Sequence, residues 1–234
     1  MRVQEQPAYI LHHRPFRDTS QIIDVLTRDH GRLSLMSRGS RSAKSRQKSI
    51  LQPFNSLILS WSGKGDLPTL TAAEALTSST CRISGKALLS AFYVNELLVK
   101  LLHKHDVHDG IYYLYESVLN LLAENGEIEP VLRLFEKQLL EELGFGLNLT
   151  VHAETGVAVV ASELYAYYLE HGPVDVASIH DDQYVTQLSG ASLLALSENN
   201  LSNEQTLKDA KRLMRSILNF YLQGKPIKSR ELFR

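Results

Sequence analysis

The chain has 234 residues, 44% hydrophobic and 22% charged, so it can build one large or two smaller globular cores. Cys81 is the single cysteine, which excludes an intramolecular disulfide and a cysteine-based zinc site within one chain. No stretch reaches the roughly eighteen apolar residues of a membrane span, and the N-terminus lacks a secretion signal. We therefore expect a cytoplasmic protein that does not associate with membranes.

The formal net charge of -1 conceals an uneven distribution of charge along the chain. Residues 1–83 carry a net charge of +6, residues 84–206 carry -13, and residues 207–234 carry +6. Two basic ends therefore flank an acidic middle, and this asymmetry says more about possible partners than the net charge does.

The N-terminal residues alternate between apolar and polar side chains and predict five strands, at residues 8–14, 21–28, 31–37, 51–61 and 67–76. The second and third strands form the clearest hairpin, in which Gly31 can supply the positive φ of a tight turn. Five short strands without a long helix between them predict a small closed or half-open barrel, a common platform for single-stranded nucleic acid.

A basic loop follows the third strand, and its cations are separated by glycine, serine and alanine. No acidic residue occurs between Asp29 and Asp66, so no neighbour in the sequence neutralises the loop. Long cationic side chains among small residues suit a sugar–phosphate backbone, although a solvated surface loop is the simpler alternative. We expect DNA contacts in this part of the chain from Arg14, Arg32, Arg38, Arg41, Lys44, Arg46 and Lys48.

From Ile83 onwards the apolar spacing becomes helical, and we predict helices at residues 83–105, 111–123, 130–143, 189–197 and 204–222. Residues 145–188 are less regular, and residues 157–169 fit either a helix or strands. The fold class is therefore α+β, with a barrel domain at residues 1–80 and a helical domain at residues 81–234. The basic C-terminal stretch predicts a second DNA contact, carried by Lys211, Arg215, Lys225, Lys228 and Arg230.

Other groupings of polar residues point to neither catalysis nor metal binding. His103, His105 and His108 lie at a predicted helix end, where neighbouring side chains point to different faces, so solvation explains them better than a metal. The segment 62–65 (SGKG) lacks the earlier glycine and the hydroxyl residue of a P-loop. We therefore expect no catalytic residue and no cofactor.

Arg133 and Lys137 are a basic pair in the acidic middle, four residues apart on one face of a predicted helix. The simpler interpretation is that they form salt bridges with nearby glutamates. The alternative is a socket for an acidic peptide with apolar anchors.

The chain resembles the recombination mediator family RecO of bacterial DNA repair. The residues that carry the resemblance span nearly the whole chain in the expected order: Ala8–Pro15 with Thr19–Ser20, Gly31–Arg41, Leu51–Phe54, Tyr93–Leu97, Arg133–Glu136 and Gly224–Leu232. None of these segments is a catalytic signature, but the ordered set is specific to the family.

The resemblance implies an N-terminal OB-fold, a helical C-terminal domain and no enzymatic turnover. It also implies binding of single- and double-stranded DNA, annealing of complementary strands, and work with RecR in loading RecA onto DNA covered by single-strand-binding protein. Such a protein is expected to be cytoplasmic and associated with the nucleoid. Many members carry a four-cysteine zinc module, but residues 149–172 here hold no cysteine, so we expect a degenerate, zinc-free insert near 149–188.

Some relatives bind the acidic, phenylalanine-ended tail of single-strand-binding protein on the helical domain, and Arg133 matches the basic residue implicated there. The resemblance thus favours a socket at Arg133 and Lys137, with Leu97 or Leu101 as an apolar slot for the phenylalanine. Two other classes stay open: an OB-fold enzyme or ribosome-associated factor would need a nucleotide or metal site, and a pure scaffold would leave the basic loop unexplained.

Overall fold

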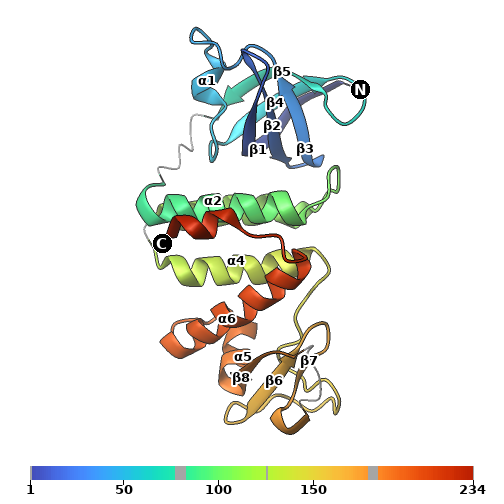
Figure 1. Cartoon of the computed structure of the whole chain (residues 1–234), viewed down its shortest axis with the longest axis vertical. Coiled ribbons are helices and arrows are strands. Elements are labelled where there is room, and N and C mark those ends of the chain that lie inside the picture. Colours follow the sequence, from blue (N-terminus) through green and yellow to red (C-terminus); the bar gives the residue numbers. More distant parts are fainter. Residues whose placement is uncertain (1, 77–82, 125, 179–183, 234) are drawn as a thin grey trace. The chain divides into compact units, whose positions relative to one another are not determined.

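The structure, a computed structural model, describes residues 2–76, 83–124, 126–178 and 184–233 (Figure 1). Their contacts divide the chain into two compact units, one of residues 1–126 with 227–234 and the other of residues 127–226. The predicted boundary near residues 77–84 falls largely outside the described residues. We describe each unit by itself.

The first unit begins with a closed five-stranded barrel in the order β1-β2-β3-β5-β4, in which β4 pairs back onto β1. All neighbours are antiparallel except β3 and β5, which meet in parallel at Met36 and Thr69. This is the predicted OB-fold. The strands are β1 (Arg2–Phe16), β2 (Ser20–Thr27), β3 (Gly31–Ser37), β4 (Leu57–Ser62) and β5 (Thr69–Ala75).

The period-two pattern of the strands fills the barrel with aliphatic side chains. Leu33 and Leu35 on β3 and Leu57 and Leu59 on β4 are fully or almost fully buried in one core cluster. The hairpin between β2 and β3 turns at Gly31, whose φ of 62° confirms the predicted need for glycine.

The predicted fourth strand was too long at its start. Residues 47–50 form a short helix, α1 (Gln47–Ile50), and β4 begins only at Leu57. Pro53 cannot donate to a ladder, and Phe54 turns the chain at a φ of 69°. Leu51 is buried in the barrel core even though it is not in a strand.

Two helices pack with the barrel in the first unit, α2 (Gly85–Leu101) and α3 (Asp109–Ala123). A buried chain of hydrogen bonds joins them: the Tyr115 hydroxyl donates to Asn95 Oδ1 at 2.6 Å, and Asn95 Nδ2 donates to the carbonyl of Leu11 on β1 at 2.9 Å. Burial raises the pKa of Tyr115 well above its ordinary value, so this hydroxyl stays a donor.

The last residues of the chain return to the first unit as a 3₁₀ turn, η2 (Lys228–Phe233), which lies alongside α2 (Figure 1). The Glu96 carboxylate on α2 accepts hydrogen bonds from the backbone N–H groups of Lys228 at 2.9 Å and Ser229 at 2.8 Å. Glu96 therefore caps the first turn of η2 and fastens the C-terminus.

The second unit combines helices with a small antiparallel sheet of order β7-β6-β8. The sheet resolves the alternative left open for residues 157–169, because residues 164–168 form a strand. The elements are α4 (Ile128–Glu142), β6 (Leu164–Tyr168), β7 (Gly172–Asp175), η1 (Val176–Ser178), β8 (Tyr184–Ser189), α5 (Gly190–Ser197) and α6 (Glu204–Tyr221).

The ends of the helices in this unit are capped by residues close to them in the sequence. Gly144 follows α4 at a φ of 83°, and its N–H donates to the carbonyl of Glu141, so α4 ends in a left-handed glycine. Helix α6 begins where the Asn203 side chain accepts from the N–H groups of Gln205 and Thr206. No helix in the described ranges is long and apolar enough to span a membrane.

Candidate nucleic-acid interface

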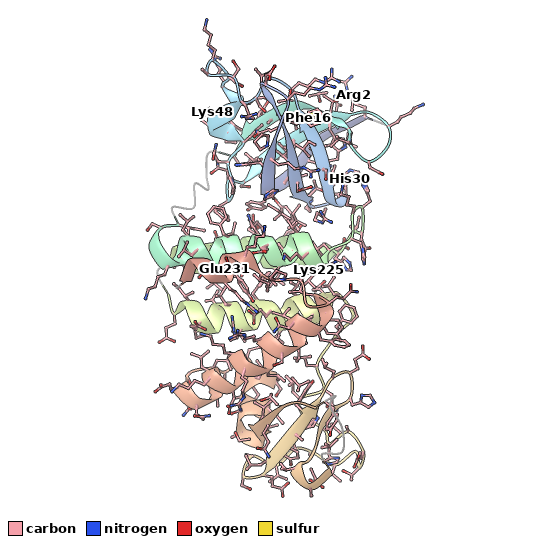
Figure 2. All side chains as sticks on the ribbon, viewed as in Figure 1. Arg2, Phe16, His30, Lys48, Lys225 and Glu231 are labelled. Atoms are coloured by element: carbon pink, nitrogen blue, oxygen red, sulfur yellow. The ribbon has the colours of Figure 1, made fainter. Side chains whose placement is uncertain are left out.

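The predicted basic loop lies at one end of the barrel, which we call the basic end and define as the β1–β2 turn at residues 17–19 together with residues 38–48. Strands β1 and β3 both finish at this end, because Phe16 and Ser37 both pair with the start of β2. The β2–β3 turn lies at the other end, and Figure 2 shows His30 in that turn on the opposite side of the barrel from Lys48.

Backbone hydrogen bonds hold the basic loop against the β1–β2 turn. The Arg41 N–H donates to the carbonyl of Thr19 at 2.8 Å, and Arg41 Nη1 donates to the carbonyl of Arg17 at 3.1 Å. The Arg17 guanidinium lies over the ring of Phe16, 5.3 Å from its centre. Arg17 and Phe16 therefore join the basic end, although neither belongs to the cationic run 38–48 that is visible in the sequence.

Four cations of the basic end point into solvent. These four residues are Arg38, Lys44, Arg46 and Lys48. In the described part of the chain, their charged groups form no ion pair with an acidic side chain and no hydrogen bond. Arg14, near the end of β1, is also exposed. The turn adds one exposed acid, Asp18, so the basic end is strongly but not purely cationic. Such a surface can bind phosphates without first breaking an ion pair.

Arg32 does not share this position. Its Nε and Nη2 donate to the carbonyl of Leu102 at 3.1 and 2.9 Å, so it covers the carbonyl end of α2. Burial lowers the pKa of Arg32 but leaves it charged. Because two of its donors already bind a carbonyl inside the unit, Arg32 is not part of the candidate interface.

The outer face of the barrel also holds a half-buried acid, Asp24 on β2. Burial alone would raise its pKa, but hydrogen bonds from His12 and Ser34 and the charge of Arg32 outweigh burial and hold the pKa below its ordinary value. The Ser34 hydroxyl donates to Asp24 at 2.5 Å. Asp24 is therefore a hydrogen-bonded structural carboxylate, and its lowered pKa does not suit a general base.

The predicted second DNA contact is divided between the two units. Lys228 and Arg230 belong to the first unit, where the Arg230 guanidinium lies 5.6 Å from the centre of the Tyr93 ring. Lys211 belongs to the second unit and forms an ion pair of 2.8 Å with Glu129. Arg215 and Lys225, also in the second unit, are exposed.

The predicted peptide socket is partly occupied by intramolecular contacts. Arg133 is 6% exposed, and its Nη2 donates to the Glu136 carboxylate at 2.7 Å. Lys137 Nζ donates to Asn199 Oδ1 at 2.8 Å and to the carbonyl of Ser197 at 3.3 Å. Within the described residues, Arg133 Nε has no hydrogen-bond partner.

The two apolar residues assigned to the socket lie on α2, in the other unit. Leu97 is completely buried, and Leu101 is half-buried.

The histidines and the cysteine-free insert show ordinary polar packing. His108 Nε2 lies 3.1 Å from the Asp106 carboxylate, and the described residues contain no group of three potential ligands arranged for a metal. In the insert, His152 Nδ1 accepts from the N–H groups of Glu154 and Thr155 at 3.2 and 3.3 Å. A ring nitrogen thus receives amide hydrogen bonds in the tight loop of the insert.

Comparison with known proteins decides the family. The family model for the N-terminal part of recombination protein O matches residues 1–79, and the model for its C-terminal part matches residues 83–231. The chain belongs to the recombination protein O (RecO) family.

Similar proteins cover nearly the full chain. The DNA repair protein RecO of Nitrosococcus oceani is 42% identical over 232 residues, which are 99% of this chain and 93% of the relative. That of Coxiella burnetii is 42% identical over 231 residues, 99% of this chain and 98% of the relative. That of Aromatoleum aromaticum is 36% identical over 233 residues, 100% of this chain and 96% of the relative. RecO membership supports a role in DNA repair and recombination.

Proposed function

We propose that this RecO protein is a non-enzymatic, DNA-binding recombination mediator that holds single- and double-stranded DNA and anneals complementary strands. The observation that carries the proposal is the basic end of the OB-fold, where Arg38, Lys44, Arg46 and Lys48 are exposed with no ion-pair partner among the described residues. Binding phosphates releases counterions from the DNA, and this favourable term does not depend on sequence. The interface should therefore show little sequence preference.

We further propose the partners that family membership suggests: RecR as a co-worker, and RecA as the recombinase loaded onto DNA covered by single-strand-binding protein. Annealing requires two strands to be held at once, and the exposed cations Arg215, Lys225 and Lys228 offer contacts outside the basic end. Annealing in the absence of ATP separates this function from that of an OB-fold enzyme.

The DNA contact is tested with Lys44→Gln combined with Lys48→Gln in the full chain. Each phosphate contact to single-stranded DNA contributes roughly 0.7 to the slope of log affinity against log salt, so the double variant should lower the slope by about 1.4. The measurement is fluorescence anisotropy with an oligonucleotide across a salt series. A matched control, Lys64→Gln with Lys86→Gln, removes two exposed lysines of the same unit outside the basic end. Equal slopes for all three proteins would remove the basic end from the interface.

We also propose that Arg133 and Lys137 receive the acidic tail of single-strand-binding protein. The surrounding unit is acidic, so an acidic peptide is repelled by most of its surface, and a cationic pair sets both place and register. The unused Arg133 Nε donor supports the proposal, because a buried guanidinium gains from a further acceptor. The tail carboxylate must either meet this Nε or displace Glu136 from the guanidinium.

The structure changes the design of the experiment for this socket. Arg133→Ala would leave the buried Glu136 carboxylate without its 2.7 Å ion pair, which costs about 3–5 kcal/mol of stability. Arg133→Lys keeps a cation for Glu136 but loses the planar fork. It should weaken binding of a tail peptide by about tenfold in calorimetry and leave DNA affinity nearly unchanged. Arg215→Lys is the matched control, and an unaltered peptide affinity in folded Arg133→Lys would place the tail elsewhere.

A further inference from the structure

Two rings at the C-terminal end of α6 meet a ring that follows α4 at the surface of the second unit, and we call these three residues the aromatic cluster: Phe145, Phe220 and Tyr221. The rings of Phe145 and Tyr221 stack with centres 4.2 Å apart and an interplanar angle of 25°. The ring of Phe220 meets Tyr221 edge to face at 5.3 Å. Phe220 is 51% exposed and Phe145 is 40% exposed, so the cluster is only partly covered by the fold.

Core packing does not account for Phe220. Helix α6 buries Leu213, Met214 and Ile217 completely, and these residues define the face that turns inward. Phe220 instead continues the ridge of Arg212 and Ser216, because residues four apart lie one above the other. An exposed phenylalanine at the end of a polar ridge is therefore available for a ligand.

The exposed side of α6 is cationic on the N-terminal side of this ring. Lys211 and Arg212 form ion pairs with Glu129 and Asp209, whereas Arg215 has no side-chain partner among the described residues. Arg215 lies about 7.5 Å from Phe220 along the helix axis and about 140° around it, so its long side chain leaves the neighbouring face of the helix. The rest of the second unit lacks such a run of cations, so a polyanion is attracted to this part of the unit.

The far side of Phe220 has a groove and one exposed cation, at a helix C-terminus whose negative potential is partly reduced. A groove of about 490 Å³ borders the ring and is lined by Asn219, Phe220, Tyr221, Gln223 and Gly224. The carbonyls of Asn219 and Phe220 at this helix end accept from the N–H groups of Gly224 and Gln223, which reduces their negative potential. Lys225 follows immediately and is exposed.

The other side of the aromatic cluster is less suitable. A smaller pocket of about 280 Å³ beside Tyr221 is lined by Tyr167 and Glu170. Burial and the Glu170 carboxylate raise the pKa of Tyr221, which shows that a negative charge faces the ring there. Phosphates are therefore directed towards the Phe220 side.

We propose that Phe220, with Lys225 beyond it and Arg215 on the neighbouring face of α6, is a stacking site for an unpaired base of single-stranded nucleic acid. The inference rests on the proposed function and adds a second, base-contacting site to it. An aromatic face accepts any base, so the site selects single strands over duplex without selecting sequence. An acidic peptide with an aromatic end shares the charge and the apolar anchor, and the experiment distinguishes it.

The test uses the full chain with Phe220→Leu, which keeps an apolar side chain but removes the π face. Affinities are measured by anisotropy at one salt concentration for an oligothymidylate and for an abasic oligonucleotide of the same length. We expect Phe220→Leu to lose about fivefold or more for oligothymidylate and nothing for the abasic strand. Phe220→Trp should retain the wild-type preference, and Tyr113→Leu, which removes an exposed ring of the first unit, should change neither affinity.

Three outcomes would overturn the proposal: wild-type oligothymidylate binding by Phe220→Leu, an equal loss for both oligonucleotides, or a loss confined to an acidic peptide ending in phenylalanine. These outcomes are distinct from failure of the proposed function. If the proposed function fails, the wild-type protein will bind neither oligonucleotide, or the basic-end variants will leave the slope of log affinity against log salt unchanged.

Discussion

The C-terminus of the chain is predicted to depend on a single carboxylate, that of Glu96. It accepts from the N–H groups of Lys228 and Ser229 and forms an ion pair with Lys100 at 3.1 Å. Glu96→Gln keeps one acceptor oxygen but presents an NH₂ group to the second N–H and removes the charge. One charge-assisted hydrogen bond is lost, so the docked tail should weaken by about 1.5–3 kcal/mol.

The assay is hydrogen exchange, because a tail of eight residues can open without unfolding the rest of the unit. The amides of Lys228 and Ser229 should exchange about ten to a hundred times faster in Glu96→Gln than in the wild-type protein. Glu124→Gln is the matched control, since the Glu124 side chain is exposed and forms no hydrogen bond or ion pair with the described residues. Equal protection of both amides in wild type and Glu96→Gln would refute the argument that this carboxylate holds the tail.

The same contact has a defined pH dependence. Burial alone would raise the pKa of Glu96, but the hydrogen bonds from Ser229 and Lys228 and the Lys100 ammonium lower it below its ordinary value of 4.5. A carboxylate with a lowered folded-state pKa stabilises fully above its unfolded pKa and loses that contribution as the pH falls through the folded pKa. Tail protection should therefore decline below about pH 4.5 in the wild-type protein and be flat there in Glu96→Gln.

Two further predictions concern the first unit. Gly31→Ala should destabilise by more than about 2 kcal/mol in urea unfolding, because a residue with φ of 62° is strained and the new Cβ would lie 2.1 Å from the Asp106 carbonyl oxygen; a loss below 1 kcal/mol would contradict this close approach. Asn95→Ala should cost about 2–5 kcal/mol, because the Tyr115 hydroxyl and the Leu11 carbonyl would be buried without a partner; Tyr115→Phe, which leaves one of those bonds intact, should cost less.

Local signals in the sequence were sufficient for the hairpin and for most of the helices. Gly31, Gly144 and Asn203 each act within a few residues of their own position, so turn and cap rules locate them. The predicted first strand, residues 8–14, was too short, because β1 runs from Arg2 to Phe16 and both Pro7 and Pro15 are paired within it. A proline interrupts a strand only where its missing N–H is needed for pairing.

The small sheet of the second unit could not be predicted from local signals. Strand β6 pairs with β8 through residues that are 16 to 25 positions apart in the sequence, from Tyr168 with Tyr184 to Leu164 with Ser189. The alternating tyrosines of β6 fit either a strand or a helix over so short a stretch, and only the pairing decides between them.

The candidate site, like the fold, could be predicted only where it depends on residues that are close together in the sequence. The basic loop itself was visible as a run of cations, and its residues remain the strongest candidates for DNA contact. Which cations stay exposed was not visible, because their partners are distant: Arg32 binds Leu102 seventy residues away, and Lys211 pairs with Glu129 eighty-two residues away. A count of cations in the sequence therefore overestimates the number of cationic side chains that are available to bind phosphate.

The exposed charge also bears on how annealing could work. Under the proposed function the basic end contacts the DNA backbone, and backbone contacts alone hold single and double strands alike. Annealing requires in addition that bases stay accessible until a complementary strand arrives and that the duplex is then released. A stacking ring such as Phe220 satisfies this requirement, because a base on an aromatic face is held by about 1–3 kcal/mol and is given up once pairing offers more. Arg215 and Lys225 would hold the phosphates of the same strand, while pairing removes the base from the ring. Phe220→Leu should therefore slow annealing more than it weakens duplex binding, whereas loss of Lys44 and Lys48 should weaken both.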